Sequence, residues 1–207
     1  MLKIWGRATS SNVKKVLWCC EELGIPFERI DVGGPFGGNK EPAYLKLNPN
    51  GLVPTVEDEG LVIWESNTIL RHLASTRAGG EALYPRDPAI RTQVERWMDW
   101  QISRMAGYLT ILMVGWIRTT PEKRDAVALE EARHHASELW RMLEAQLESR
   151  DYLAGKSLTL ADICLGNMYY MWTNVPVERP KLSALKAWGE RIAQRPGYRK
   201  YVAIPLA

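Results

Sequence analysis

The stretch NPNGLVPTVEDEGLVIWESN, from Asn48 to Asn67, constrains the fold of this chain more than any other. Its first four residues are turn formers that stop a helix and reverse the chain. Two short apolar runs, Pro54–Glu57 and Leu61–Trp64, flank an Asp-Glu-Gly turn, a pattern that is typical of a β-hairpin. Residues 65–67, Glu-Ser-Asn, then place a carboxylate and a helix cap before an apolar segment with helical spacing. The sequence therefore predicts a turn, a hairpin and a capped helix in succession.

Three residues of this stretch have the chemistry to bind an amino-acid head group and the extended peptide attached to it. Val53 precedes a proline, which favours an extended backbone that can present its N–H and C=O groups to a peptide. Ser66, at a helix start, offers a hydroxyl and backbone N–H groups to a carboxylate. Glu65 beside it could hold an ammonium group. The alternative interpretation is a hairpin and a capped helix without any ligand.

The residues before this stretch predict one further α/β unit. A short strand at Leu2–Trp5, a polar loop at 6–12, a helix at Val13–Leu23 and a second strand at Phe27–Val32 follow one another. With the hairpin and its helix this gives the order β-α-β, then β-β-α, which is typical of a thioredoxin-like domain. The loop before the first helix contains hydroxyls and an amide where a redox thioredoxin has cysteine, so disulfide exchange by a protein thiol is not expected.

The second half of the chain has only helical patterns. Residues 80–88 are rich in turn formers and predict a boundary between two domains. A long helix from Ala89 to about Ile117 is expected next, then a helix opened by Thr120 that ends near Arg150. Thr159 and Asp162 form a capping box before an apolar helix. A last amphipathic helix at 182–194 precedes a short tail.

Taken together, these motifs resemble the cytosolic glutathione S-transferases, in particular bacterial theta- or nu-like members. The resemblance is carried by Asn-Pro-x-Gly-x-Val-Pro, the Glu-Ser pair after the hairpin, and the capping box, and it covers essentially all 207 residues. It implies a thioredoxin-like, glutathione-binding domain over residues 1–80. An all-α domain over residues 88–207 would form the electrophile site and part of a homodimer interface. Pro54 stands where this fold has a cis-proline.

The resemblance also implies the roles of particular residues. Ser10 resembles the serine that donates a hydrogen bond to the glutathione sulfur, Asn12 resembles the asparagine with a similar role in nu-like members, and Thr9 and Ser11 are further candidates. No tyrosine lies in this loop, so activation by tyrosine is excluded. The implied glutathione-binding residues are Lys40, Val53, Pro54, Glu65 and Ser66. The electrophile is expected beside the first long helix, near Arg104, Tyr108, Leu112 and Trp116.

The capping box is expected to be structural rather than catalytic. Asp162 would secure the helix at the centre of the second domain, with Thr159 as its N-cap. Loss of a cap residue costs about 1–2 kcal/mol, so replacing Asp162 with Ala is expected to impair folding by about that much.

Composition excludes several other classes of function. The net charge is only +3, with Lys and Arg interspersed among Asp and Glu, which argues against nucleic acid and membrane surfaces as partners. No apolar run approaches the length of a membrane span, and the N-terminus lacks the apolar segment of a signal peptide. Three cysteines without a CxxC pair suit the reducing cytoplasm. The three histidines show no metal-ligand spacing, so no metal is expected.

We therefore expect a detoxifying glutathione S-transferase. It would activate the glutathione thiolate for attack on a small hydrophobic electrophile, by conjugation or displacement. One alternative is a glutathione-dependent disulfide reductase or peroxidase that uses the same site, which an Asn12-centred mechanism would favour. The other is a non-catalytic binding scaffold with the same fold. The sequence does not identify the electrophile.

Overall fold

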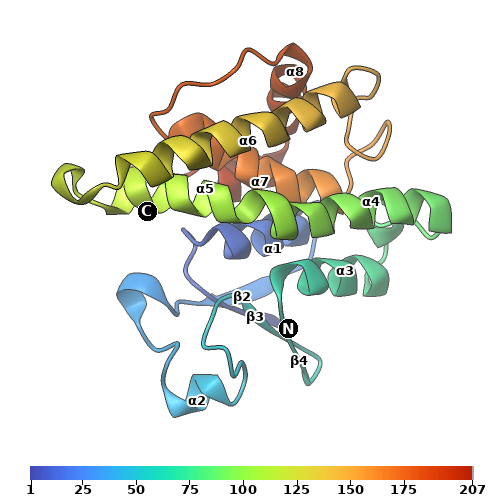
Figure 1. Ribbon diagram of the computed structural model, residues 1–207. Coiled ribbons are helices and arrows are strands. Elements are labelled where there is room, and N and C mark those ends of the chain that lie inside the picture. The colour runs from blue at the N-terminus through green and yellow to red at the C-terminus, as the bar shows by residue number, and fades with distance from the viewer. Residues whose placement is uncertain (207) are drawn as a thin grey trace.

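A computed structural model describes residues 1–206 and shows a four-stranded mixed sheet in the first half of the chain (Figure 1). The strand order is β2-β1-β3-β4, with β1 and β2 parallel and the other neighbours antiparallel. This order confirms the predicted thioredoxin-like arrangement. The strands are β1 (Leu2–Trp5), β2 (Phe27–Ile30), β3 (Thr55–Asp58) and β4 (Leu61–Trp64).

Two helices pack between this sheet and the helical half, namely α1 (Ser11–Glu22) and α3 (Ser66–Thr76). Helix α1 is buried on every side from Val13 to Cys20, because the sheet lies on one face and the second half of the chain covers the other. A short helix, α2 (Pro42–Leu45), lies in the connector between β2 and β3. The N-terminal ends of α1 and α3 thus lie next to the junction of the two halves.

The second half consists of helices. The predicted long helix runs without a break through α4 (Pro88–Trp100), a π-helical turn (Gln101–Met105), α5 (Ala106–Met113) and a second π-helical turn (Val114–Arg118). It is followed by α6 (Ala126–Leu147), α7 (Leu160–Asn174) and α8 (Ser183–Ile192). The expected short tail includes a π-helical turn at Tyr198–Val202, which packs on α1.

Two predicted helix starts differ from the structure. Thr120 opens only a 3₁₀ turn (Pro121–Lys123), and α6 begins at Ala126 with Asp125 as its cap, whose carboxylate accepts a hydrogen bond from the Ala128 N–H at 3.0 Å. Arg124 holds the intervening loop by donating to the Gly115 carbonyl at 3.0 Å. Helix α3 begins at Ser66 itself, so Asn67 lies inside the helix rather than capping it.

Helix α7 lies at the centre of the helical half, and the predicted capping box is present at its start. Its residues from Leu160 to Met168 are buried on all sides, and Trp18, Trp140 and Trp188 are among the largest buried side chains of the core. Among residues 1–206 no helix is long and apolar enough to cross a membrane.

Candidate active site

Three loops from different parts of the first domain meet at Val53. A β-carbon built on Gly6 would lie 3.2 Å from the Val53 β-carbon, and one built on Gly33 would lie 3.5 Å from a Val53 methyl group. The Val53–Pro54 peptide bond is cis, as the resemblance implied. Within residues 1–206 the Val53 backbone N–H and C=O groups make no hydrogen bond. They remain open to an extended peptide lying along this edge.

Ser10 is the N-cap residue of α1 and is 9% exposed. Its carbonyl accepts a hydrogen bond from the Lys14 N–H at 2.9 Å, but its side chain makes no capping hydrogen bond. The hydroxyl is therefore available to donate to a ligand atom. The first N–H groups of α1 also lack intrahelical partners, which favours a negative charge in front of this helix.

The starts of α1 and α3 lie side by side. The Ser66 hydroxyl, on a residue that is 5% exposed, donates to the Asn12 amide oxygen at 3.3 Å. Glu65 precedes α3 with φ of +69° and an exposed side chain. A non-glycine residue with such a positive φ costs about 1–3 kcal/mol, and such residues cluster at functional sites. This hydrogen bond thus brings the N-terminal ends of α1 and α3 together.

Lys40 lies on the neighbouring turn rather than extending freely into solvent. Its ammonium group donates to the Asn50 carbonyl at 3.3 Å, and a β-carbon on Gly51 would come within 2.7 Å of it. The Asn39 side chain donates to the Gly51 carbonyl at 2.8 Å and holds the same turn. The side chain of Lys40 is exposed and can still contact a ligand.

The four residues expected beside the electrophile do not share one environment. Leu112 has no exposed surface and lies in the core rather than on a surface that a ligand can reach. Tyr108 stacks on His135 of α6 with ring centres 4.9 Å apart, and Trp116 lies under the Arg124 guanidinium at 4.7 Å. Most of this stripe faces the other helices, whereas Arg104 is exposed.

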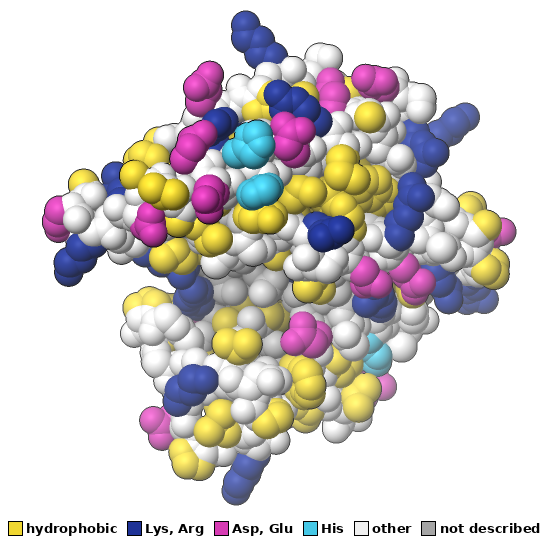
Figure 2. Space-filling model, viewed as in Figure 1, with side chains coloured by type: hydrophobic (Ala, Val, Ile, Leu, Met, Phe, Trp, Pro, Cys, Tyr) yellow, Lys and Arg dark blue, Asp and Glu magenta, His cyan; other side chains and the backbone are white. Residues whose placement is uncertain are grey.

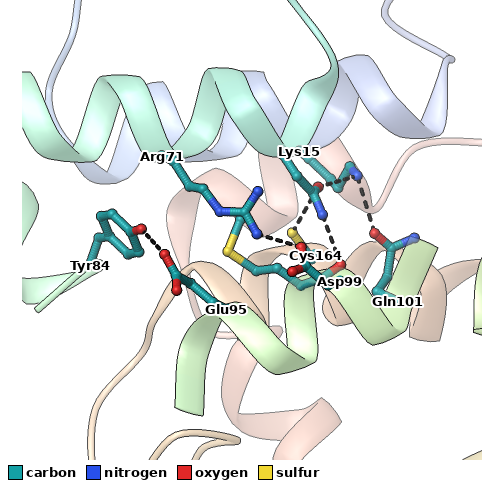
Figure 3. Close-up of polar contacts among 9 residues, drawn as sticks. Lys15, Arg71, Tyr84, Glu95, Asp99, Gln101 and Cys164 are labelled. Atoms are coloured by element: carbon teal, nitrogen blue, oxygen red, sulfur yellow. Dashed lines mark hydrogen bonds and ion pairs between the residues drawn. The ribbon is translucent and has the colours of Figure 1, made fainter. Parts of the chain in front are cut away.

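A buried polar network that the sequence did not reveal lies behind the start of α3 (Figure 3). The fully buried Lys15 ammonium donates to the amide oxygens of Asn67 at 2.8 Å and Gln101 at 3.3 Å. The Cys164 thiol also donates to the Asn67 oxygen, at 3.3 Å. Burial lowers the pKa of Lys15, while the nearby Cys164 and Glu65 act to raise it. The network joins α1 and α3 to the π-helical turn after α4 and to α7.

The cysteines of the chain are not suited to nucleophilic chemistry. All three are buried and reduced. Burial raises the pKa of Cys20 to about 12 and that of Cys164 to about 11, and it raises the pKa of Cys19 as well. A thiol must ionise to attack, so these residues stay unreactive at neutral pH. Within the described part of the chain, no group of three or more His, Cys, Asp or Glu side chains could hold a metal ion.

The surface is hollowed between the two halves of the chain, beneath the long helix that contains α4 and α5 (Figure 2). In the ribbon view, α1 and α3 of the sheet half lie beneath this long helix (Figure 1). A thioredoxin-like domain with an all-helical domain set against its open helix ends is the architecture of the glutathione transferases.

Comparisons with known proteins agree with this architecture. Residues 9–76 match the family model described as "Glutathione S-transferase, N-terminal domain", and residues 107–196 match "Glutathione S-transferase, C-terminal domain". The chain is 36% identical to glutathione S-transferase GstB of Escherichia coli (strain K12), with 100% of both chains covered. It is 34% identical to glutathione S-transferase 3 of Zea mays, covering 99% of this chain and 95% of that protein.

A solved structure shows the same fold. The theta class glutathione S-transferase from Xanthomonas axonopodis pv. citri, with glutathione bound, aligns with a TM-score of 0.96 and 46% identity over 100% of this chain and 99% of that one. The chain belongs to the glutathione S-transferase family, which confirms the predicted fold and enzyme class.

Proposed function

We propose that this enzyme binds glutathione at the starts of α1 and α3 and transfers its sulfur to a small electrophile held between the two halves of the chain. The observation that carries the proposal is the buried Ser10 hydroxyl, which has no capping partner of its own and stands at a helix N-terminus. A family relative with 46% identity has been solved with glutathione bound.

The rest of the tripeptide is assigned to the groups around Ser10. Ser66 and the first N–H groups of α3 hold the γ-glutamyl carboxylate, and Glu65 holds its ammonium group. The open Val53 backbone, set by the cis-Pro54 bond, pairs with the peptide. Lys40 holds the glycine carboxylate, because its ammonium group stands at the edge of the same site.

The Ser10 hydroxyl stabilises the thiolate by donating a hydrogen bond to sulfur. Asn12 supports the site by accepting a hydrogen bond from the Ser66 hydroxyl at 3.3 Å. A thiol with a pKa of about 8.5 is only about 3% ionised at pH 7, and lowering that pKa to about 6.5 requires about 2.7 kcal/mol of preferential stabilisation. Because a less basic thiolate is also a weaker nucleophile, the larger part of the rate enhancement comes from holding the electrophile beside the sulfur.

The electrophile lies against the helical half, near the exposed Arg104. In the reaction the sulfur's electron pair forms a carbon–sulfur bond. In a displacement the leaving group departs with the pair of the bond that breaks, and in an addition the pair of the broken π-bond moves to the neighbouring atom, which takes up a proton. We place the enzyme in the cytoplasm, in detoxification, as a homodimer, since its three cysteines are free and the chain matches both domain models of the glutathione S-transferase family.

Glutathione calorimetry combined with product analysis tests this proposal. The wild type and Ser66→Ala would be titrated with glutathione, and the products from an activated aryl chloride would be identified by mass spectrometry. We expect micromolar to millimolar binding by the wild type, at least tenfold weaker binding by Ser66→Ala, and a thioether product. Oxidised glutathione as the main product would indicate a reductase or peroxidase instead, and no binding by the wild type would leave only a scaffold.

A further inference from the structure

Lys15 is a buried cation that has hydrogen-bond partners but no counter-ion. Its side chain has no exposed surface, and its ammonium group donates to the amide oxygens of Asn67 at 2.8 Å and Gln101 at 3.3 Å. Within residues 1–206 no carboxylate forms an ion pair with it. A buried charge without a counter-ion lowers stability, so the stability of the fold does not account for a lysine at this position.

The charged and titratable groups around Lys15 do not neutralise it (Figure 3). Arg71, one turn further along α3, is paired with Asp99 at 2.5 Å. The Cys164 thiol stays protonated at neutral pH, because burial raises its pKa to about 11. Burial lowers the pKa of Lys15 and the charge of Glu65 acts to raise it, but the Glu65 side chain is exposed. An anion that binds nearby would therefore favour the charged form of Lys15.

Lys15 stands behind the two helix starts that are proposed to hold glutathione. It follows Ser10 by five residues in α1, or about 7.5 Å along the helix axis, and long helical side chains lean toward the N-terminus of their helix. Its acceptor Asn67 directly follows Ser66 in the first turn of α3. Ser66 in turn donates to Asn12 of α1 at 3.3 Å. The positive charge thus lies on the interior side of the junction between the two helix starts.

We propose that Lys15 is a positioning residue that acts through its charge, attracting the γ-glutamyl carboxylate to Ser66 and stabilising the thiolate at Ser10 without touching either group. The inference rests on the proposed transferase function and adds a residue to that site. Helix N-termini favour anions, and a full positive charge behind them strengthens the same field. Bound glutathione supplies the negative charge that Lys15 lacks within the chain. No bond to Lys15 forms or breaks in the reaction.

The size of the effect follows from Coulomb's law. A unit charge about 10 Å from the sulfur, at an effective dielectric constant of about 40 for a site open to water, lowers the pKa of the thiol by about half a unit. The same field acting on the γ-glutamyl carboxylate strengthens binding about threefold. Lys15 thus supplies the smaller part of the thiolate stabilisation, and the Ser10 hydroxyl supplies the larger part.

The test compares the wild type with three variants of the network. Gln101→Glu keeps the size of the side chain and gives the buried ammonium group a counter-ion, so it cancels the charge while Lys15 stays in place. Lys15→Met removes the charge itself. Gln101→Leu is the matched control, because it removes one hydrogen-bond partner and leaves the charge. Three quantities are measured: the pH midpoint of the thiolate absorbance of bound glutathione, the Kd of S-methylglutathione by calorimetry, and the urea midpoint of unfolding.

We expect Gln101→Glu and Lys15→Met to raise the pH midpoint by about half a unit. Both should bind S-methylglutathione, which has the carboxylates but no ionisable thiol, about threefold more weakly. Gln101→Leu should keep the midpoint of the wild type. Gln101→Glu should nevertheless unfold at a higher urea concentration than Gln101→Leu, because the buried cation gains a partner. A purely structural role of the network predicts the reverse, with the better-held variant closer to the wild type in its midpoint.

Two results would overturn the role of the Lys15 charge. One is a pH midpoint that is the same in all four proteins. The other is an equal rise in Gln101→Glu and Gln101→Leu, since the hydrogen bonds of the network would then set the site. In both cases a lowered midpoint in the wild type would leave the transferase function standing. A wild type that does not bind glutathione would contradict the transferase function itself.

Discussion

At the scale of single residues, Asp162 does more than cap a helix. Its buried carboxylate accepts hydrogen bonds from the Leu153 N–H at 3.0 Å, the Trp188 indole at 2.9 Å, and both the N–H and the hydroxyl of Thr159 at 2.9 Å. Burial raises the pKa of Asp162, while these donors act to lower it. The residue joins the start of α7 to the preceding loop and to α8.

Asp162→Ala is therefore expected to cost more than the roughly 1–2 kcal/mol of a lost cap. The donors on Leu153, Thr159 and Trp188 would be left buried without an acceptor, at about 1–3 kcal/mol each, so we expect a loss of at least about 3 kcal/mol. Urea denaturation measures this, with Thr159→Ser as a control that keeps the hydroxyl. A loss no larger than that of an exposed cap residue would show that Asp162 has no role beyond the first turn of α7.

At the scale of secondary-structure elements, the β3–β4 hairpin is joined to α3 by Asp58. The Asp58 carboxylate, which is 5% exposed, binds the His72 ring at 2.8 Å and the Arg77 guanidinium at the end of α3. Burial acts to raise the pKa of Asp58, but the hydrogen bonds from His72 and Arg77 outweigh it, and the pKa is lowered.

This contact gives a stability that depends on pH. Because the pKa of Asp58 is lower in the folded than in the unfolded chain, where it is about 3.9, the stabilisation is complete above about pH 5 and is lost as the pH falls through the folded value. Asp58→Asn is expected to cost about 1.5–3 kcal/mol at pH 7 and progressively less below pH 4, by thermal or urea denaturation. Asp31→Asn, at an exposed ion pair, serves as the control. A difference that is constant from pH 7 to pH 3 would contradict the assignment.

The Lys15 network is expected to couple the two halves of the chain energetically. Lys15→Met and Gln101→Leu each leave a buried polar group with fewer partners, whereas the double variant removes both groups at once. We therefore expect a coupling free energy of about 1 kcal/mol or more in a double-mutant cycle of unfolding free energies. Losses that add within about 0.5 kcal/mol would mean that the two side chains do not depend on each other.

At the scale of the whole molecule, the local sequence motifs of the chain predicted the fold well. The turn cluster, the hairpin and the Glu-Ser pair indicated the sheet half, and the capping box indicated α7. What could not be predicted depends on tertiary packing. Lys15 lies on a helix that is buried all round, so no periodicity distinguishes its environment. Arg7 stands in a polar loop, and only the folded chain brings Gly34 to it.

The stripe chosen for the electrophile illustrates the same limit. Residues spaced by four along the long helix lie on one face of it, but their spacing does not show which other helix packs against that face. In the structure Leu112 is buried and Tyr108 stacks on α6, while Ile111 and Val114, on another face, are exposed. The residues that bind a second substrate are set by how two domains are placed, and that placement has no local sequence signal.

The homodimer is a prediction about the assembled molecule. One chain has a mass of 23.6 kDa, so static light scattering on a size-exclusion column is expected to give twice that mass. The measured mass should stay constant on dilution to low micromolar concentration if the interface is of the stable kind. A mass equal to one chain at every concentration would contradict the proposed dimer.

The most direct test of the account is the ionisation of bound glutathione, followed by the ultraviolet absorbance of its thiolate as the pH is raised. With the wild type, we predict a midpoint about two pH units below that of free glutathione. With Ser10→Ala, bound glutathione should ionise near its free value and turnover should fall by at least tenfold, while calorimetry still shows binding. An unshifted midpoint in the wild type, or the same shift in Ser10→Ala, would contradict the central role given to the Ser10 hydroxyl.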